Sequence, residues 1–213
     1  MNVSRQLEEI YQRLDRHFGD LRWWPGQTPF EIIVGAILTQ NTSWGNVEKA
    51  IRNLKTGNLL SPLKLGRIGQ EELAQLIRPS GYYNIKARRL RSFLDFLKSE
   101  YRNSLKRMFS EDTERLREKL LGVNGIGEET ADSILLYAGN KPAFVVDAYT
   151  RRILERHGLM PAGSRYGDIQ RLFLGCLSPS VRLFNQYHAL IVKTGNQYCR
   201  KTPRCEGCPL NGL

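Results

Sequence analysis

The sequence predicts an all-α protein. Apolar residues recur at helical spacing along most of the chain, whereas runs with the strict alternation of a strand are scarce. Glycine and proline stand between the periodic segments, where they end one helix and precede the next. With 213 residues, of which 41% are hydrophobic and 25% charged, the chain can bury the core of one large domain or two small ones.

The pattern divides into about ten helices. The first, "SRQLEEIYQRLDRHF", is amphipathic and lacks the compact apolar core of a signal peptide. The helix after Ser80 and Gly81 has one apolar face and one cationic face, the latter with Lys86, Arg88 and Arg89. The expected ranges are 2–18, 28–40, 43–55, 70–77, 83–100, 112–121, 128–138, 147–157, 165–176 and 181–195.

The charge balance favours a polyanionic partner. The chain has 32 Lys and Arg against 21 Asp and Glu, a formal net charge of +11, and nucleic acid is the commonest partner of so basic a protein. Charge alone does not exclude two alternatives, a soluble basic protein without such a partner and a protein that binds a membrane surface. No apolar run approaches the roughly 20 residues that cross a bilayer. We expect a cytoplasmic, nucleoid-associated monomer.

Residues 121–131, "LGVNGIGEETA", form the most conspicuous turn. The link between the two flanking helices is so short that it predicts a tight hairpin, with Val123 and Ile126 packed into the core. Amides and the helix dipole at the start of the second helix attract anions, so Gly122, Gly125 and Gly127 are candidate contacts to a DNA phosphate. A helix–turn–helix corner with glycine caps and no ligand is the alternative.

Several segments together resemble one family. "LGVNGIGEETADSILLYAGNKPAFVVDAYTRRI" resembles the helix-hairpin-helix and Gly/Pro-Asp segment of the endonuclease III superfamily of DNA glycosylases. "FEIIVGAILTQNTSWGNVEKAI", "PSGYYNIKARRL" and "CRKTPRCEGCPL" resemble further family segments in the same order, so the resemblance covers nearly the whole chain. It implies a two-lobed fold: a six-helix lobe over 25–130 with hairpin 121–131, and a second lobe from 1–24 and 131–213 that ends in cysteine loop 199–208.

Two acidic residues carry the implied chemistry. Asp147 follows the apolar "AFVV" and precedes a helix, where an aspartate is a natural N-cap and the helix start favours its ionised form. By resemblance it is the family's catalytic aspartate, located in the cleft between the lobes, where it stabilises the sugar cation or activates water. Strand-cutting relatives carry a nucleophilic lysine where this chain has Glu129, so the resemblance implies base removal without strand cleavage. Glu129 orients water or contacts the base, or is simply a first-turn glutamate.

The tryptophans indicate the kind of base. A cationic alkylated purine leaves readily and stacks well on aromatic rings, and Trp23, Trp24 and Trp44 are the candidates for its pocket. Core packing is the alternative for each of them. "WWP", "FEIIVGAILTQNT" and "GIGEETADSILLYA" are similar to the endonuclease III-type 3-methyladenine DNA glycosylases.

Five side chains are expected to contact opened DNA. By resemblance Gln40 fills the gap that the flipped base leaves, and Tyr82 wedges into the opposite strand. Lys86 and Arg88, with Arg89, follow closely and are candidates to hold phosphates. The alternatives are a capping glutamine, a packed tyrosine and a solvated basic face.

The cysteines suggest a metal centre. Clustered cysteines in a reducing compartment favour metal over disulfides, and Cys199, Cys205 and Cys208 resemble the family's [4Fe–4S] loop. That loop places a fourth cysteine about six residues after the third, which would be position 214. The cluster therefore lacks one cysteine ligand here, the chain is clipped, or the loop is a remnant. Zinc bound by three cysteines and another ligand competes. Cys176, within "LFLGCL", is expected in the core.

The preferred function is a monofunctional DNA glycosylase for alkylated purines such as 3-methyladenine. A glycosylase for oxidised bases, uracil or mismatched thymine, and a DNA-binding module without activity, remain open. The adenine-mismatch branch also lacks the lysine but adds a long further domain.

Overall fold

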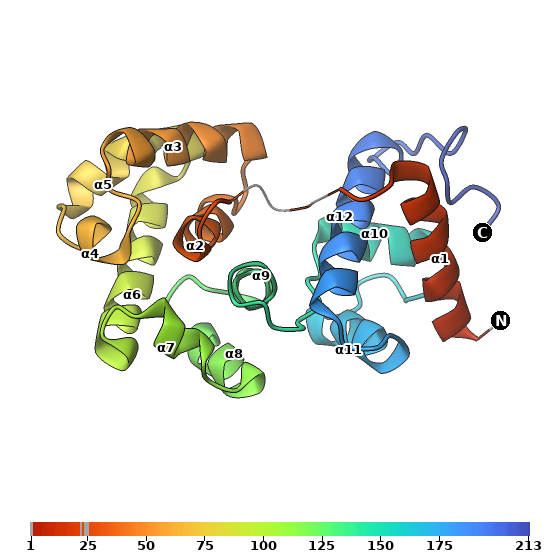
Figure 1. The fold of residues 1–213 in the computed structure, drawn as a ribbon. Helices are drawn as coiled ribbons and strands as arrows, with labels where there is room; N and C mark the ends of the chain where they lie inside the picture. The colour runs from red at the N-terminus through yellow and green to blue at the C-terminus, as the bar shows by residue number, and fades with distance from the viewer. Residues whose placement is uncertain (1, 22, 24–25) are drawn as a thin grey trace. The chain divides into compact units, whose positions relative to one another are not determined.

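The computed structural model describes residues 2–21, 23 and 26–213, and this part of the chain is helical with connecting turns and no strand (Figure 1). The all-α prediction is confirmed. The backbone divides into two compact units, one of residues Trp24–Lys141 and the other of Met1–Trp23 with Pro142–Leu213. No helix in the described residues is long and apolar enough to cross a membrane.

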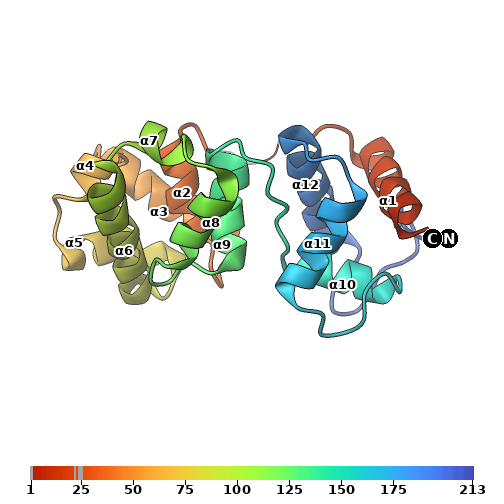
Figure 2. The same ribbon diagram turned by 90° about the horizontal axis from the view of Figure 1, so that it is seen from below.

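The unit Trp24–Lys141 is built around α2 (Pro29–Leu38). Thr28 caps this helix and Pro29 occupies its first turn, and almost all of its side chains are buried because other helices surround it. The other helices are α3 (Trp44–Thr56), α4 (Pro62–Leu65), α5 (Gln70–Leu76), η1 (Arg78–Ser80), α6 (Tyr83–Tyr101), α7 (Leu105–Phe109), α8 (Thr113–Leu121), α9 (Glu128–Ser133) and η2 (Ile134–Ala138). Of these, α3, α6, α9 and η2 pack against α2 (Figure 2).

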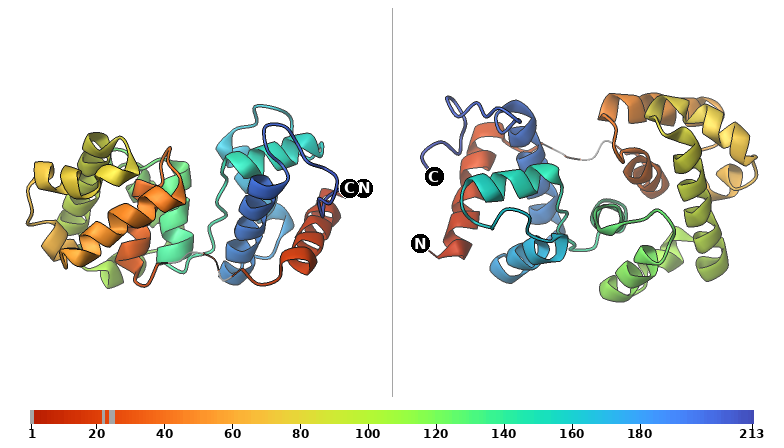
Figure 3. Two further views of the ribbon diagram at one scale, coloured as in Figure 1. Left: turned by 90° about the horizontal axis from the view of Figure 1, so that it is seen from above. Right: turned by 180° about the vertical axis from the view of Figure 1, so that it is seen from behind.

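In the unit formed by Met1–Trp23 and Pro142–Leu213, α12 (Val181–Gln197) packs on α1 (Val3–Phe18) and α10 (Ala148–Arg156). An aromatic cluster fills the core beside α11 (Tyr166–Cys176): the rings of Phe144 and Phe173 stack at 3.7 Å, and Phe184 and Tyr187 meet Phe144 edge-on. The two chain ends lie on the same side of this unit (Figure 3). Cys176, expected in the core, is instead half-buried at the end of α11.

The boundary between the units differs from the predicted one. We expected the first lobe to end at residue 130, but the compact unit continues to Lys141 because α9 and η2 both pack against α2. The predicted helix 128–138 changes from an α-helix to a π-helical turn at Ile134. Three short helices, α4, η1 and α7, lie in segments that the sequence left without structure.

Candidate functional site

The glycine turn folds as the predicted hairpin between α8 and α9. Val123 and Ile126 are buried, which is the predicted packing of the turn into the core. Gly127 is the N-cap residue of α9, and Gly122 ends α8 in helical geometry. Of the three glycines only Gly125 has a positive φ, of 86°. Binding of a phosphate by this turn stays a prediction.

Gly125 also lies against the side chain of Arg89 on α6. A Cβ at residue 125 would stand 2.2 Å from Arg89 Cγ and 2.7 Å from its Cδ. Real Cβ atoms do not approach other heavy atoms so closely. The turn therefore needs glycine here for two separate reasons, backbone conformation and space.

Gln40 joins this same hairpin. Its amide Nε2 donates to the carbonyl of Gly125 at 3.1 Å and to Thr130 Oγ1 at 2.8 Å. The guanidinium of Arg89 donates to Gln40 Oε1. The side chain that we expect to fill the gap in DNA is thus held by three hydrogen bonds within the protein. One of them comes from Arg89, which also lies against Gly125 of the hairpin.

Tyr82 stands out from the surface of its unit. It has left-handed backbone geometry, with φ 46° and ψ 33°, directly before α6, and 68% of the residue is exposed. Ile85, in the first turn of α6, is 41% exposed, and Arg88 is exposed as well. A large exposed aromatic in a strained turn marks a candidate contact residue.

Lys86 was predicted to hold a phosphate, and this prediction is wrong. The residue is 1% exposed, and its ammonium donates to the carbonyls of Leu38 at 2.9 Å and Ser80 at 2.6 Å. Burial, with the nearby Arg89 charge, lowers the pKa of Lys86 to about 8. Leu38 ends the helix that leads to Gln40, and Ser80 precedes Tyr82 by two residues. Lys86 therefore ties together the two segments that carry the candidate contact residues.

Replacing Lys86 with methionine is expected to lower the free energy of unfolding by about 2 kcal/mol, because two buried carbonyls lose their donor. Denaturant unfolding followed by circular dichroism measures this. Arg88→Met, on the exposed face of the same helix, is the matched control and should change stability by less than about 0.5 kcal/mol. Equal effects of the two substitutions would contradict the structural role of Lys86.

Asp147 is the N-cap of α10, as predicted. Its Oδ1 accepts hydrogen bonds from Thr150 N at 2.7 Å and Thr150 Oγ1 at 2.8 Å. His188, on α12, places Nε2 3.7 Å from Asp147 Oδ2, and the Asp147 side chain is 12% exposed. Burial alone would raise the pKa of Asp147, but His188 and the Thr150 hydrogen bonds outweigh it and hold the pKa below its ordinary value. The carboxylate is therefore ionised at neutral pH.

His188 is the site residue that the sequence analysis missed. It is 5% exposed, in a helix whose central residues are nearly all buried. Its position 41 residues after Asp147 carries no local signal, because only the packing of α12 on α10 brings the two side chains together.

Glu129 is exposed in the first turn of α9, and its carbonyl accepts a hydrogen bond from Ser133 Oγ at 2.7 Å. Glu129 and Asp147 belong to different compact units. Their joint action on a substrate remains a prediction.

The three tryptophans were predicted as candidates for one base pocket, and the two that the structure describes lie in different compact units. Trp44, within the predicted helix 43–55, is the first residue of α3, where it is half-buried and its indole Nε1 donates to Glu48 Oε1 at 2.9 Å. Trp23 is half-buried and belongs to the other unit. Trp24 lies outside the described residues. A shared aromatic base pocket is therefore still a prediction.

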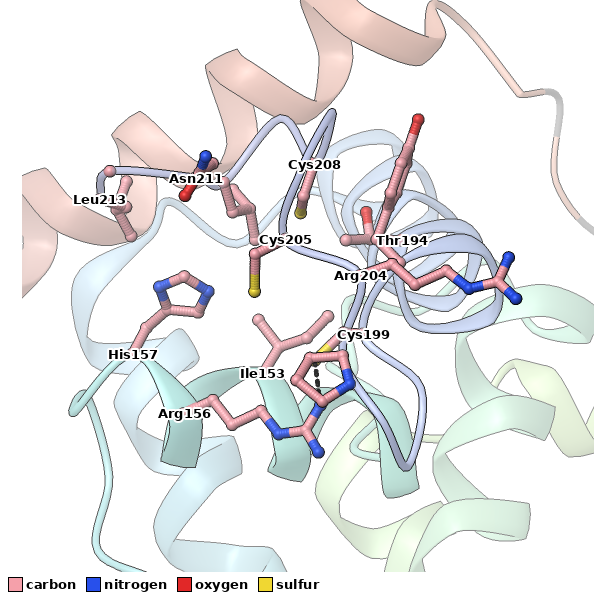
Figure 4. Close-up of a pocket in the computed structure, with 14 residues that line it drawn as sticks. Ile153, Arg156, His157, Thr194, Cys199, Arg204, Cys205, Cys208, Asn211 and Leu213 are labelled. Carbon is pink, nitrogen blue, oxygen red and sulfur yellow. Dashed lines mark hydrogen bonds between the residues drawn. The ribbon is translucent and has the colours of Figure 1, made fainter.

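Cys199, Cys205 and Cys208 line one cavity of about 160 Å³, together with Ile153, His157 and Leu210 among others (Figure 4). Cys199 is buried, Cys208 half-buried and Cys205 exposed, and all are free thiols. Within the described residues, no three Cys, His, Asp or Glu side chains converge closely enough to hold one metal ion. Binding of an iron–sulfur cluster or of zinc by these cysteines stays a prediction.

Comparison with known proteins identifies the family. The sequence profile of the HhH-GPD superfamily of base excision DNA repair proteins matches residues 34–179, which include the hairpin and Asp147. The chain belongs to this superfamily. The superfamily's helical fold and its action on DNA as a glycosylase are therefore shown for this protein.

Individual relatives agree with this assignment. A Methanocaldococcus jannaschii protein, provisionally named a DNA repair glycosylase, is 44% identical over 98% of this chain and 96% of its own length. The thymine/uracil-DNA glycosylase of Pyrobaculum aerophilum is 27% identical over 92% of this chain and 84% of its own. Among solved structures, the H. pylori 3-methyladenine DNA glycosylase bound to 1,N6-ethenoadenine is 30% identical, with a TM-score of 0.78 over 92% of this chain and 98% of that one.

Proposed function

We propose that this protein is a monofunctional DNA glycosylase that hydrolyses the bond between a damaged base and its sugar and leaves an abasic site. The observation that carries the proposal is Asp147 at the start of α10, whose partly exposed carboxylate has a lowered pKa, in a chain that has Glu129 where the resemblance to strand-cutting relatives implies lysine. Glycosylase chemistry needs a carboxylate, whereas strand cleavage through an imine needs an amine.

Asp147 supplies that carboxylate in a fixed position. Thr150 occupies Oδ1 with two hydrogen bonds, so Oδ2, the oxygen nearest His188, is the one that can face the sugar or a water molecule. As the base departs, the carboxylate stabilises the positive charge on the sugar. Water then bonds to the sugar carbon, and its proton passes to Asp147. The base leaves with the electron pair of the broken bond.

Replacing His188 with glutamine is expected to shift the acid side of the excision-rate profile to higher pH. His188 is the first of the groups that lower the pKa of Asp147, and activity is lost as pH falls through that pKa. Without His188 the pKa rises, so the loss begins at higher pH. Single-turnover rates between about pH 4 and pH 7 test this. His17→Gln, an exposed histidine of the same unit, should leave the profile unchanged.

Opening of the duplex is assigned to the other unit. We propose that Gln40 fills the gap left by the flipped base and that Tyr82 wedges into the opposite strand, with Arg88 on a neighbouring phosphate. The high exposure of Tyr82 supports its role. The hydrogen bonds of Lys86 to Leu38 and Ser80 would hold the two inserting segments in a fixed relative position. Amides of the Gly122–Gly127 hairpin would bind a phosphate of the same strand.

The absence of a lysine at residue 129 predicts that the DNA strand stays intact. Incubation with substrate followed by mild alkali should cut the DNA, whereas incubation alone should not. Borohydride should trap no adduct between protein and DNA, because no imine forms. Glu129→Gln is the matched variant and should also fail to trap. An adduct with the unchanged protein would overturn the monofunctional assignment.

Alkylated purines such as 3-methyladenine are the preferred substrate of this proposal. The 30% identity to a 3-methyladenine glycosylase supports them, as does half-buried Trp44, four residues after Gln40. Uracil or mismatched thymine is the second candidate, supported by the 27% identity to a thymine/uracil-DNA glycosylase.

One experiment separates the two candidates. The protein is incubated with methylated DNA and with duplexes that carry a single uracil or thymine opposite guanine, and released bases are identified by chromatography. Release of 3-methyladenine supports the first candidate and release of uracil or thymine the second. No release from any substrate would leave a DNA-binding module and overturn the proposed enzyme.

A further inference from the structure

Gln40 is held in one orientation in the free protein. The two ends of its amide meet groups of opposite kind, since Nε2 donates to Gly125 O and Thr130 Oγ1 whereas Oε1 accepts from the Arg89 guanidinium. Exchanging the amide nitrogen and oxygen would set a donor against the guanidinium and an oxygen against the Gly125 carbonyl. The side chain that we propose to enter DNA is therefore stored against the hairpin in a defined position.

Arg89 reaches Gln40 across the glycine turn. It lies in the second turn of α6 and is half-buried. The hydrocarbon part of its side chain passes over Gly125, where a Cβ would stand 2.2 Å from Arg89 Cγ. A hydrogen bond from a charged donor is stronger than one between neutral groups. Arg89 is thus the main restraint on Gln40, and the lack of a side chain at residue 125 gives it room to act.

The guanidinium of Arg89 has no negative partner in the part of the chain that the structure describes, where it takes part in no ion pair. Arg117, on α8, is different, because its Nε lies 2.7 Å from Asp132 Oδ1 and its Nη2 3.0 Å from Oδ2. Lys86 lies close enough that the Arg89 charge, after burial, helps to lower its pKa to about 8, so two cations share this region. An anion would bind the Arg89 guanidinium more strongly than a neutral amide does.

Departure of Gln40 would free this charge. Once the Gln40 side chain enters a duplex, the half-buried guanidinium loses the acceptor that it has in the free protein, which is unfavourable unless another acceptor replaces it. The DNA that receives Gln40 carries phosphates along both strands. Phosphate oxygens are well matched to the planar donors of a guanidinium. Arg89 can therefore exchange the amide for a phosphate when Gln40 is inserted.

We propose that Arg89 is a positioning residue that couples the insertion of Gln40 to binding of the DNA backbone. In the free protein and on intact DNA it holds Gln40 against the hairpin. At a lesion it releases Gln40 and binds a phosphate instead. The exchange replaces one set of hydrogen bonds with another and changes no covalent bond. This inference rests on the proposed function, because it takes Gln40 as the side chain that fills the gap.

Salt titrations of DNA binding test the exchange, with an undamaged duplex and a duplex that carries a stable tetrahydrofuran abasic site. Each bound phosphate adds about 0.9 to the slope of log affinity against log salt concentration. Gln40→Ala should steepen the slope on undamaged DNA by about that amount, because Arg89 is then free to bind a phosphate without any insertion. Arg89→Met keeps a side chain over Gly125 and removes the charge. It should flatten the slope by about 0.9 on abasic DNA and leave it unchanged on undamaged DNA.

The double variant Gln40→Ala with Arg89→Met isolates the exchange. On undamaged DNA its slope should return to that of the unchanged protein, because the added phosphate contact needs Arg89. Arg89→Lys in the same background should keep most of the steeper slope, since the charge remains. Arg88→Met, on the exposed face of the same helix, is the matched control and should change the slope by the same amount with and without Gln40. Circular dichroism checks that each variant is folded.

Two results would overturn the exchange alone. One is an unchanged slope on undamaged DNA for Gln40→Ala. The other is an equal flattening by Arg89→Met with and without Gln40, which would make Arg89 an ordinary phosphate contact. Failure of the proposed function gives a different result: equal affinity of the unchanged protein for the two duplexes would contradict gap filling by Gln40 and would overturn this inference with it.

Discussion

Asp147→Asn is expected to lower the rate of base excision by about 10³-fold or more while binding to DNA is retained. Asparagine keeps an oxygen for the two Thr150 hydrogen bonds, but it removes the negative charge that stabilises the sugar cation. The fold should tolerate the change, because asparagine and aspartate are similar N-caps. Single-turnover excision and a gel-shift measurement with the same duplex give the two quantities.

Asp168→Asn is the matched control for this substitution. Asp168 lies in the first turn of α11, in the same unit, and pairs with Arg171 at the surface. Its replacement should change the excision rate less than about twofold, since a surface ion pair contributes little. Near-normal excision by Asp147→Asn would mean that another group performs the chemistry.

Gly125→Ala is expected to lower the free energy of unfolding by about 2 kcal/mol and to weaken DNA binding. The new methyl group would need a φ near 86° and would stand 2.2 Å from Arg89 Cγ, so the turn and the Arg89 side chain must both move. Moving Arg89 also disturbs its hydrogen bond to Gln40. Denaturant unfolding and DNA titration at fixed salt measure the two effects.

Gly127→Ala provides the comparison within the same hairpin. Residue 127 has φ −92°, and a Cβ there would meet nothing within 4 Å. Its stability should change by less than about 0.5 kcal/mol. If the two alanine variants are equally stable, the close approach of Arg89 to the turn is not what requires Gly125.

The hairpin, the N-cap aspartate and the helical class could be predicted from the sequence because each has a local signal. Glycine spacing gives the turn, and an aspartate between an apolar run and an amphipathic segment gives the cap. The short helices α4, η1 and α7 could not be predicted in this way. Segments of three to five residues carry too little periodicity to separate a helix from a turn.

The charge of Lys86 led to a wrong prediction of its exposure. The cluster of basic residues around it was assigned to one solvent face, yet residue 86 is spaced by four and seven from Leu90 and Phe93, which are buried. Helical spacing therefore placed Lys86 on the core stripe, and its charge was given more weight than its position. His188 is the opposite case, since no spacing rule could relate it to Asp147 before α12 packed on α10.

The hydrogen bonds of Gln40 have a consequence for how lesions are discriminated. In its proposed role, the Gln40 side chain must leave Gly125, Thr130 and Arg89 before it enters a duplex, and at about 1 kcal/mol for each contact the departure costs about 3 kcal/mol. Such a cost would make insertion rare at intact pairs and frequent where damage has already weakened the stack. Selection of lesions would thus begin with the energetic cost of moving Gln40, before a flipped base reaches the Asp147 carboxylate.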